Sequence, residues 1–391
     1  MSGLQKQMQK RNLGSRLPSG LPPMPPSGVP GGRRHGPAVG GGLRRKRDFT
    51  PTPWQEYFET CEDVKVDECN IFRVYKSGHE GPVLLFLHGG GHSGLSWAVL
   101  SSIVSKLVKC RIVAIDLRGH GDTKTANEED LSAETLSSDI GNVISSLYGD
   151  EAAPPIIMVG HSMGGAIAIH AGVKNLIPSL IGLIVIDVVE GTALDALQSM
   201  QSFLRGRPKQ FKSLEYAIEW AVKSGQIRNI ESAKVSMIGQ LKRLQGLEAL
   251  SLESCTPSFS AHEDVIREEP DEGQSADSTN SLEIESFVPY TWRVNLSKTE
   301  KFWKGWFQGM SNLFLSNIVP KMLVLAGVDR LDRDLTIGQM QGKFQMQVLP
   351  QCGHAVHEDQ PKMVADALAT FMLRHRFTEA LSDFERPFPS C

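Results

Sequence analysis

One stretch indicates the fold most clearly: Ile156-Ile157-Met158-Val159-Gly160-His161-Ser162-Met163-Gly164-Gly165-Ala166-Ile167-Ala168. Its first four residues form an apolar run that predicts a buried strand, and the small residues at its end predict a helix. The motif G-x-S-x-G between them is the nucleophile elbow, a sharp turn that lifts the serine Oγ clear of a sheet. A side chain at position 160 or 164 would collide with the neighbouring strand or helix. The pattern predicts Ser162 as a catalytic nucleophile.

Other short apolar runs alternate with helical patterns on both sides of this stretch. They are nearly continuous in hydrophobicity, as expected of parallel strands covered on both faces. We expect strands at Pro82–Leu87, Arg111–Leu117, Ile156–Val159, Leu180–Ile186, Lys321–Ala326 and Phe344–Leu349, and helices at Leu131–Tyr148 and Gly164–Lys174. Strands that alternate with helices predict an α/β fold with a doubly wound, mostly parallel sheet.

One connection is too long for a simple crossover, because more than 130 residues separate Asp187 from Lys321. Its first part, about 192–250, has helical spacing of apolar residues. Ligand sites in open α/β sheets lie at the carboxyl ends of the strands, so we expect a helical cap, about 192–320, inserted after the sixth strand. Its last aromatic residues are interpreted mainly as cap packing, with one or two left as candidates to line an apolar pocket: Tyr290, Trp292, Phe302, Trp303, Trp306, Phe307 and Phe314.

Two segments have compositions that do not predict a packed core. Residues 1–47 contain ten Gly, seven Pro and ten basic residues but no acidic residue, and are interpreted as a disordered arm. Residues 251–288 contain ten acidic residues and one basic residue, Arg267, and are interpreted as an exposed acidic loop within the cap. Residues 48–391 are expected to form one α/β domain that includes the cap.

Charge and cysteine usage exclude several classes of protein. The net charge of −3 hides an asymmetry, because 31 basic and 44 acidic residues remain outside the arm. The sequence therefore does not predict a basic folded domain that binds nucleic acid. The six scattered cysteines lack a CxxC pair, which argues against a disulfide scaffold or a zinc ribbon. No apolar run approaches the roughly 18 residues that span a bilayer, and the N-terminus lacks a signal peptide's apolar core. We expect a cytoplasmic or nuclear protein that is not secreted and binds neither membrane nor nucleic acid.

A glycine-rich loop directly follows the predicted strand Pro82–Leu87. Its sequence, His88-Gly89-Gly90-Gly91, has the position and type of the oxyanion loop of lipases and esterases. Glycines let a backbone N–H approach a substrate oxygen closely. We expect the oxyanion to accept hydrogen bonds from the amides of Gly90 and Met163, with either glycine beside Gly90 as the alternative.

A general base is expected after the last strand, in Gln351-Cys352-Gly353-His354-Ala355-Val356-His357-Glu358. Serine hydrolases with this kind of elbow place their histidine here, because the chain order is serine, acid, histidine. His354 is preferred, since it follows Gly353 in a loop that can reach back to the elbow. His357 is the rival, although it lies nearer the final helix.

The acid that orients the histidine has two candidates, each at the end of a predicted strand. Asp187 ends Leu180–Ile186, and Asp329 follows Lys321–Ala326. The later strand is the usual place for the acid in this fold, but sequence spacing alone does not choose between them. The strand end Asp116-Leu117-Arg118-Gly119-His120-Gly121 is interpreted as a structural turn without a catalytic role.

Several segments closely resemble the protein phosphatase methylesterase family of α/β-hydrolases: His88–Ser93, Gly160–Gly165, Ile186–Gly191, Phe203–Lys209, Ala326–Asp332 and Gln351–His357. The match covers about residue 48 to the end. It implies a serine carboxylesterase that removes the methyl ester from the C-terminal leucine of the protein phosphatase 2A catalytic subunit, its substrate and binding partner. It also implies Ser162 as nucleophile, His354 as base and Asp187 as acid. No metal or organic cofactor is expected.

The chain departs from the family in its charged segments. The family's acidic insert often carries a short basic run that can serve nuclear import, whereas residues 251–288 hold only Arg267 as a basic residue. Arg44-Arg45-Lys46-Arg47 therefore remains as the import candidate, with a solvated charge run as the alternative interpretation.

Two other functions stay open at the level of the sequence. A general small-molecule carboxylesterase would use the same elbow and base, although the long cap with its acidic insert argues against a secreted lipase. A phosphatase-binding scaffold with secondary esterase activity would use the cap for docking. Ser162 itself excludes haloalkane dehalogenase and epoxide hydrolase chemistry, which needs an aspartate at the elbow.

Overall fold

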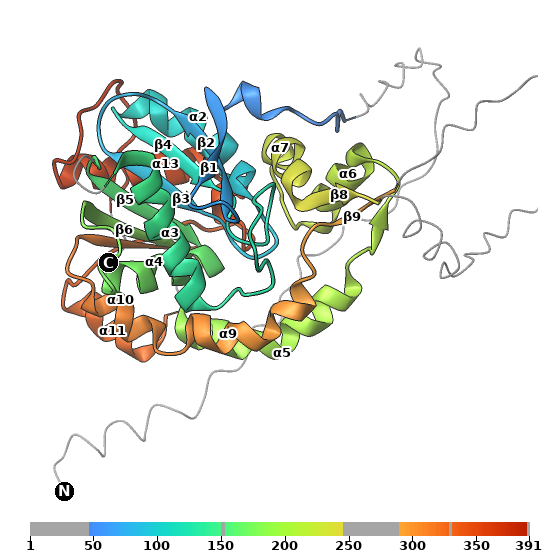
Figure 1. Ribbon diagram of the computed structural model, residues 1–391. Coiled ribbons are helices and arrows are strands. Elements are labelled where there is room, and N and C mark those ends of the chain that lie inside the picture. The colour runs from blue at the N-terminus through green and yellow to red at the C-terminus, as the bar shows by residue number, and fades with distance from the viewer. Residues whose placement is uncertain (1–46, 150–152, 245–288, 328–330, 389–391) are drawn as a thin grey trace, which may run out of the picture. The chain divides into compact units, whose positions relative to one another are not determined.

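The structure is a computed structural model that describes residues 47–149, 153–244, 289–327 and 331–388 (Figure 1). The predicted disordered arm, apart from Arg47, and the whole predicted acidic loop lie outside these ranges. In the described part of the chain, no helix is both long enough and apolar enough to cross a membrane.

An eight-stranded sheet forms the centre of the fold, in the order β1-β2-β4-β3-β5-β6-β10-β11. The six strands β4, β3, β5, β6, β10 and β11 are mutually parallel. Their bounds are β3 Val83–Leu87, β4 Arg111–Ile115, β5 Ile156–His161, β6 Leu180–Ile186, β10 Lys321–Leu325 and β11 Gln345–Val348. Each overlaps a predicted strand, so the predicted doubly wound, mostly parallel sheet is confirmed.

Two further strands, β1 Thr60–Lys65 and β2 Ile71–Ser77, are absent from the sequence-based prediction. They form an antiparallel hairpin, and β2 adds it to the sheet by pairing with β4, also antiparallel. β1 lies at the sheet edge and is mostly exposed, with Val64 as its one buried residue. Such an edge strand lacks the continuous apolar run that marks the central strands.

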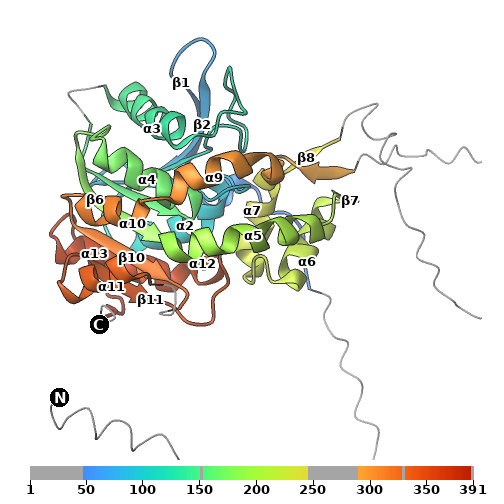
Figure 2. The ribbon, with the colours of Figure 1, turned by 90° about the horizontal axis from the view of Figure 1, so that it is seen from below.

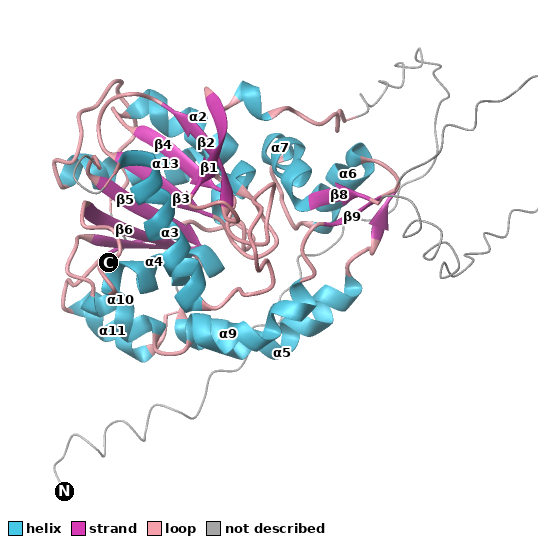
Figure 3. Ribbon diagram, in the orientation of Figure 1, coloured by secondary structure: helices cyan, strands magenta, loops and turns pink. Residues whose placement is uncertain are grey.

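Helices cover both faces of the sheet (Figure 3). Val83, Leu85 and Leu87 of β3 pack with α3 Ala133–Tyr148 and α4 Met163–Val173. Leu84 and Phe86 of the same strand pack with α2 Ala98–Leu107 and α13 Pro361–Arg374 on the other face. Successive side chains of a strand point to opposite faces, so a continuous apolar run fills two cores at once. The remaining helices outside the insertion are η1 Trp54–Glu56, η2 Gly94–Trp97, α11 Arg333–Met340 and α12 Val356–Asp359.

A mainly helical insertion connects β6 to β10, as predicted for the cap. In Figures 1 and 2, α5 and α9 run side by side along one edge of the domain. Its elements are α5 Glu190–Gly206, β7 Gln210–Phe211, α6 Leu214–Ser224, α7 Ile230–Gln240, β8 Leu241–Arg243, β9 Tyr290–Trp292, η4 Leu296–Thr299, α9 Glu300–Phe307 and α10 Met310–Ser316.

The insertion also contains a small antiparallel sheet, β7-β9-β8, that the sequence did not suggest. β8 and β9 border the segment 245–288, and their pairing brings its two ends together. The amide of Leu244 donates to the carbonyl of Pro289 at 2.9 Å.

Most of the cap aromatics are packing residues. Trp303, Trp306, Phe307 and Phe314 are buried in the core that includes α4. The Trp306 indole N–H donates to the carbonyl of Leu131 at 2.7 Å, which ties α9 to the loop before α3. These contacts agree with the interpretation of these four residues as cap packing.

Candidate active site

Ser162 occupies the turn between β5 and α4. Its φ of 51° and ψ of −119° are strained for a residue with a side chain. Neighbouring backbone groups hold this conformation: the Ser162 amide donates to the Ile186 carbonyl at 3.0 Å, and the Ser162 carbonyl accepts from Gly165 and Ala166. The turn leaves the side chain partly exposed at the carboxyl end of the sheet, where an incoming carbonyl carbon could reach Oγ.

The two elbow glycines are required by close backbone approach. A Cβ on Gly160 would lie 2.3 Å from the carbonyl oxygen of Gly164, inside the start of α4. A Cβ on Gly164 would lie 2.2 Å from the carbonyl oxygen of Leu87 and 2.5 Å from that of His88. The distances confirm the collisions expected from the sequence.

Replacing Gly164 with alanine is expected to lower the free energy of unfolding by about 1–3 kcal/mol or more, because strand β3 and helix α4 must separate to admit the methyl group. The matched control is Gly305→Ala, since Gly305 lies inside α9 and a Cβ there meets nothing within 4 Å. The control should be neutral or stabilising by up to about 1 kcal/mol. Urea unfolding of both variants measures the difference. Equal stability of the two variants would contradict the close approach.

His354 lies in the loop between β11 and α12, as predicted. Its Nε2 is 2.9 Å from Ser162 Oγ, and its Nδ1 is 2.8 Å from Asp187 Oδ2. A carboxylate can only accept, so Nδ1–H donates to Asp187 and Nε2 is free to accept the Ser162 hydroxyl proton. The imidazole side chain is 52% exposed, whereas the Asp187 side chain is fully buried.

Asp187 directly follows β6 and is held by two neighbouring segments. Its amide donates to the Val324 carbonyl in β10 at 2.8 Å. Its Oδ1 accepts from the Ala326 amide at 3.1 Å, which leaves Oδ2 directed to His354. Its φ of 52° turns the chain away from the strand. The rival Asp329 lies outside the described residues.

The glycine loop after β3 lies against the elbow. A Cβ on Gly89 would be 3.3 Å from Ser162 Cβ, and a Cβ on Gly90 would be 3.8 Å from Met163 Sδ. Met163 is the first residue of α4, so its N–H has no acceptor within the helix. Gly90, which carries one predicted oxyanion donor, therefore lies close to the side chain of Met163, whose amide is the other.

The rival base, His357, is placed elsewhere. It is fully buried, and its ring centroid lies 4.1 Å from that of Trp97. Neither ring nitrogen has a hydrogen-bond partner among the described residues. Burial, which is the main cause, holds the pKa of His357 well below its ordinary value. The ring is neutral and packed, which matches a structural interpretation.

Asp116 has a structural role, as expected. Its carboxylate accepts from the amides of Gly94 at 2.7 Å and Asp122 at 2.8 Å. A Cβ on Gly121 would lie 1.9 Å from Asp116 Oδ2, so the turn closes directly over the carboxylate. Burial raises the pKa of Asp116 to about 6.

Sequence reasoning assigned no role to two residues that lie near the site. Leu296, in η4 of the cap, lies over the glycine loop: a Cβ on Gly91 would be 3.0 Å from its Cδ1. His161 donates from Nε2–H to the carbonyl of His354 at 2.8 Å. Leu296 has no signal in the sequence, because its contact is long-range. For His161, its position next to Ser162 in the sequence was the one signal that it belongs to the site.

Ionisable side chains cluster around His161. Its ring centroid lies 5.7 Å from that of His92 and 4.5 Å from that of His357. His92 Nδ1 lies 3.0 Å from Oε1 of the fully buried Glu358. Within the ranges that the structure describes, no group of three or more His, Cys, Asp or Glu side chains is arranged to hold a metal ion.

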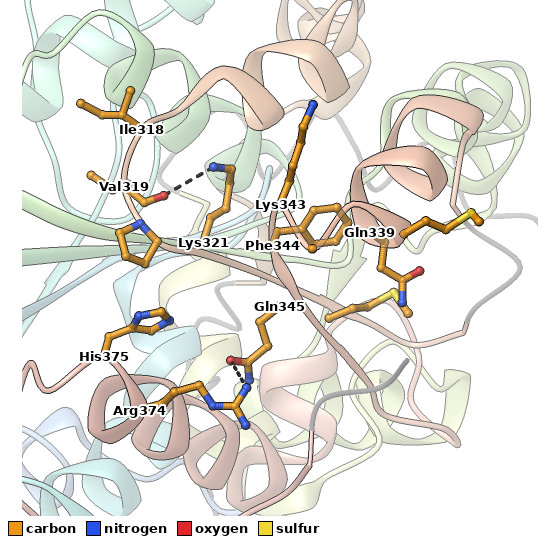
Figure 4. Close-up of a pocket in the computed structure, with 13 residues that line it drawn as sticks. Ile318, Val319, Lys321, Gln339, Lys343, Phe344, Gln345, Arg374 and His375 are labelled. Carbon is orange, nitrogen blue, oxygen red and sulfur yellow. Dashed lines mark hydrogen bonds between the residues drawn. The ribbon is translucent and has the colours of Figure 1, made fainter.

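A surface pocket of about 740 Å³ lies away from this site (Figure 4). Lys321, Lys343 and Arg374 are among its lining residues. Lys321 and Gln345 are the first residues of β10 and β11, so the pocket is at the amino ends of the strands. Ser162 and Asp187 follow the carboxyl ends of parallel strands, at the opposite edge of the sheet.

Comparison with known proteins identifies several similar sequences and folds. Residues 84–367 match the model of the alpha/beta hydrolase family. The chain is 60% identical to protein phosphatase methylesterase 1 of Mus musculus and to that of Homo sapiens, in each case over 100% of both chains. It is 46% identical to the probable protein phosphatase methylesterase 1 of Caenorhabditis elegans, over 86% of this chain and 80% of that protein.

Solved structures with low sequence identity share the fold. E-2-(acetamidomethylene)succinate hydrolase superimposes with a TM-score of 0.58 at 17% identity, covering 80% of this chain and 98% of that one. An esterase of M. tuberculosis superimposes with a TM-score of 0.53 at 19% identity, covering 81% and 92%. At these identities the likeness concerns the fold alone.

Proposed function

The chain belongs to the alpha/beta hydrolase family and, within it, to the family of protein phosphatase methylesterase 1, and we propose that it removes the methyl ester from the C-terminal leucine of the protein phosphatase 2A catalytic subunit. The observation that carries the proposed chemistry is the hydrogen-bonded chain from Ser162 through His354 to Asp187. Full-length similarity to the named methylesterases supports the choice of substrate. The roles of individual residues below are part of the proposal.

Acylation begins with Ser162. His354 Nε2, 2.9 Å from Oγ, takes the hydroxyl proton as Oγ attacks the ester carbonyl carbon. The imidazolium that forms is stabilised by the buried Asp187 carboxylate at Nδ1. The carbonyl oxygen becomes an oxyanion, which accepts hydrogen bonds from the amides of Gly90 and Met163.

Collapse of the tetrahedral intermediate breaks the bond to the methoxy group. His354 gives its proton to the departing oxygen, methanol leaves, and the leucine carbonyl remains bound to Ser162 as an acyl-enzyme. Water then attacks the acyl carbon while His354 takes a proton from it, and Ser162 regains its proton as the leucine carboxylate is released. The product carries a charge that the ester lacks, so an apolar environment around Ser162 would favour binding of the ester and release of the product.

The proposed partner is the phosphatase catalytic subunit, bound as a folded protein. The insertion between β6 and β10 supplies surface beyond the catalytic residues, and its Leu296 reaches the glycine loop. Because the cap contacts the oxyanion loop, a protein that docks on the cap can influence the position of that loop. The proposed compartment is the cytoplasm, the nucleus or both.

The proposal predicts selective loss of methyl groups from the folded phosphatase. Carboxymethylated phosphatase 2A catalytic subunit and a short methylated peptide of its tail would be incubated with the enzyme at equal concentrations. Methyl release should be rapid from the whole protein and slow from the peptide, because docking on the cap orients the ester. Methanol release or a methyl-specific antibody measures both rates.

A simple ester such as p-nitrophenyl acetate serves as the control in the same experiment. Its hydrolysis reports the state of the catalytic residues without any docking. Rapid cleavage of the simple ester with no methyl loss from either phosphatase substrate would contradict the methylesterase proposal and favour a general carboxylesterase. Binding of the phosphatase with no hydrolysis of any ester would favour a scaffold.

A further inference from the structure

The proposed base is poorly held by packing. The His354 side chain is 52% exposed, so the position of its ring depends on hydrogen bonds to the ring and to its backbone. The ring is bonded to Asp187. The backbone carbonyl of His354 accepts from the Val356 amide at 3.0 Å and from His161 Nε2 at 2.8 Å. The bond from His161 therefore ties the backbone of this loop to the elbow, beside the bond that the His354 ring shares with Ser162 Oγ.

The tautomer of His161 follows from its partner. A carbonyl oxygen can only accept, so Nε2 of His161 carries the hydrogen and Nδ1 has none in the neutral ring. His161 Nδ1 has no hydrogen-bond partner among the described residues. Burial first, and then the neighbouring rings of His357, His354 and His92, hold the pKa of His161 well below its ordinary value. His161 is thus a neutral donor with a defined direction.

Packing leaves the His161 ring little freedom. The residue is fully buried, and its ring packs against those of His354 and His357, with centroids at 4.7 Å and 4.5 Å. Gly89 also approaches the ring closely, since a Cβ there would lie 2.8 Å from His161 Nδ1. The oxyanion loop, the elbow and the loop of the base all meet at this ring.

We propose that His161 is a positioning residue, whose Nε2–H holds the carbonyl of His354 and thereby keeps the exposed imidazole in line with Ser162 Oγ. His161 directly precedes Ser162, whereas His354 lies 193 residues further along the chain. The nucleophile and the base are therefore joined through backbone and one ring, in addition to their own hydrogen bond. The inference rests on the proposed roles of Ser162 and His354.

The test compares two variants, His161→Gln and His161→Met, whose new side chains have about the same length. Glutamine keeps a donor near the place of Nε2, and methionine fills the same space without one. We expect kcat to fall about 100-fold in His161→Met with little change in KM, because a misplaced catalytic group loses reaction rate more than affinity. His161→Gln should keep kcat within about threefold of wild type. Hydrolysis of p-nitrophenyl acetate and of the methylated phosphatase gives both constants.

The control variant is His357→Met, which changes a ring of the same buried cluster that makes no hydrogen bond to His354 among the described residues. Its kcat should match wild type. Thermal unfolding of all variants separates loss of fold from loss of positioning. An equal loss of kcat in His161→Gln and His161→Met, or in His357→Met and His161→Met, would overturn the proposal in favour of a packing role.

A second readout does not depend on activity. Hydrogen exchange of the peptide 351–358, followed by mass spectrometry, should be faster in His161→Met than in His161→Gln, because the Val356 amide shares the His354 carbonyl with His161. Equal exchange in the two variants would overturn the proposal. If wild type hydrolysed no ester while this difference in exchange was present, the proposed function would fail and the positioning of the loop would stand.

Discussion

Ser162→Ala is expected to lower kcat by up to about six orders of magnitude, as loss of the nucleophile does in serine hydrolases. The variant removes the one atom that attacks the ester and the hydrogen bond to His354 Nε2. Alanine adds no atoms, so the strained turn at φ 51° can keep its backbone bonds to Ile186, Gly165 and Ala166. Binding of the phosphatase should therefore survive. Steady-state hydrolysis of the methylated phosphatase measures the loss.

A matched serine provides the control for this experiment. Ser102 lies in α2, and its hydroxyl donates to the Val99 carbonyl at 2.9 Å. Ser102→Ala should retain activity and should still react with a fluorophosphonate probe, whereas Ser162→Ala should not react. Labelling of Ser162→Ala, or kcat within tenfold of wild type, would rule out Ser162 as the nucleophile.

Asp187→Asn is expected to lower kcat by about four orders of magnitude while the fold is kept. The amide NH₂ would donate to His354 Nδ1 and stabilise the tautomer with its hydrogen on Nε2, which cannot accept the Ser162 proton. Asparagine tolerates the φ of 52° at this position, and its oxygen can still accept from the Ala326 amide. Activity on p-nitrophenyl acetate and the midpoint of urea unfolding measure both effects.

Asp329→Asn discriminates between the two acids that the sequence proposed. With Asp187 as the acid, Asp329→Asn should keep kcat within about threefold of wild type, because His354 Nδ1–H already has its acceptor in Asp187. A loss of about four orders of magnitude in kcat for Asp329→Asn, together with normal kcat for Asp187→Asn, would show that Asp329 is the acid that orients His354. Equal, partial losses in both variants would also contradict a single buried acid at Asp187.

The central strands and the elbow were predictable because their signals are local. β5 and the start of α4 fall where the apolar run and the small residues placed them, and His354 lies in the loop predicted to carry the base. Gly160 and Gly164 meet backbone atoms at 2.3 Å and 2.2 Å, as a sharp strand-to-helix turn requires. A short window of sequence contains all the information that such a turn needs.

The edge hairpin and the cap sheet were not predictable from local pattern. β1 is exposed or half-buried at every position except Val64, and β7 has two residues, so neither carries a distinct apolar run. β8 and β9 pair across more than 40 residues of intervening sequence. β2 and the three cap strands pair with strands that are distant in the chain, and composition does not identify those partners.

Local sequence pattern was enough to predict the α/β class, the strand-turn-helix that carries Ser162, the glycine loop and the loop that holds His354, because each depends on short runs of consecutive residues. The tertiary structure decided the contacts between segments. The register of β6 with β10 gives Asp187 its two backbone partners and brings its carboxylate 2.8 Å from His354 Nδ1. Packing of β5 beside β3 buries His161 under Gly89 and directs its Nε2–H to the His354 carbonyl. Spacing along the chain does not contain these distances, since they arise from sheet pairing and side-chain packing between residues more than 70 positions apart.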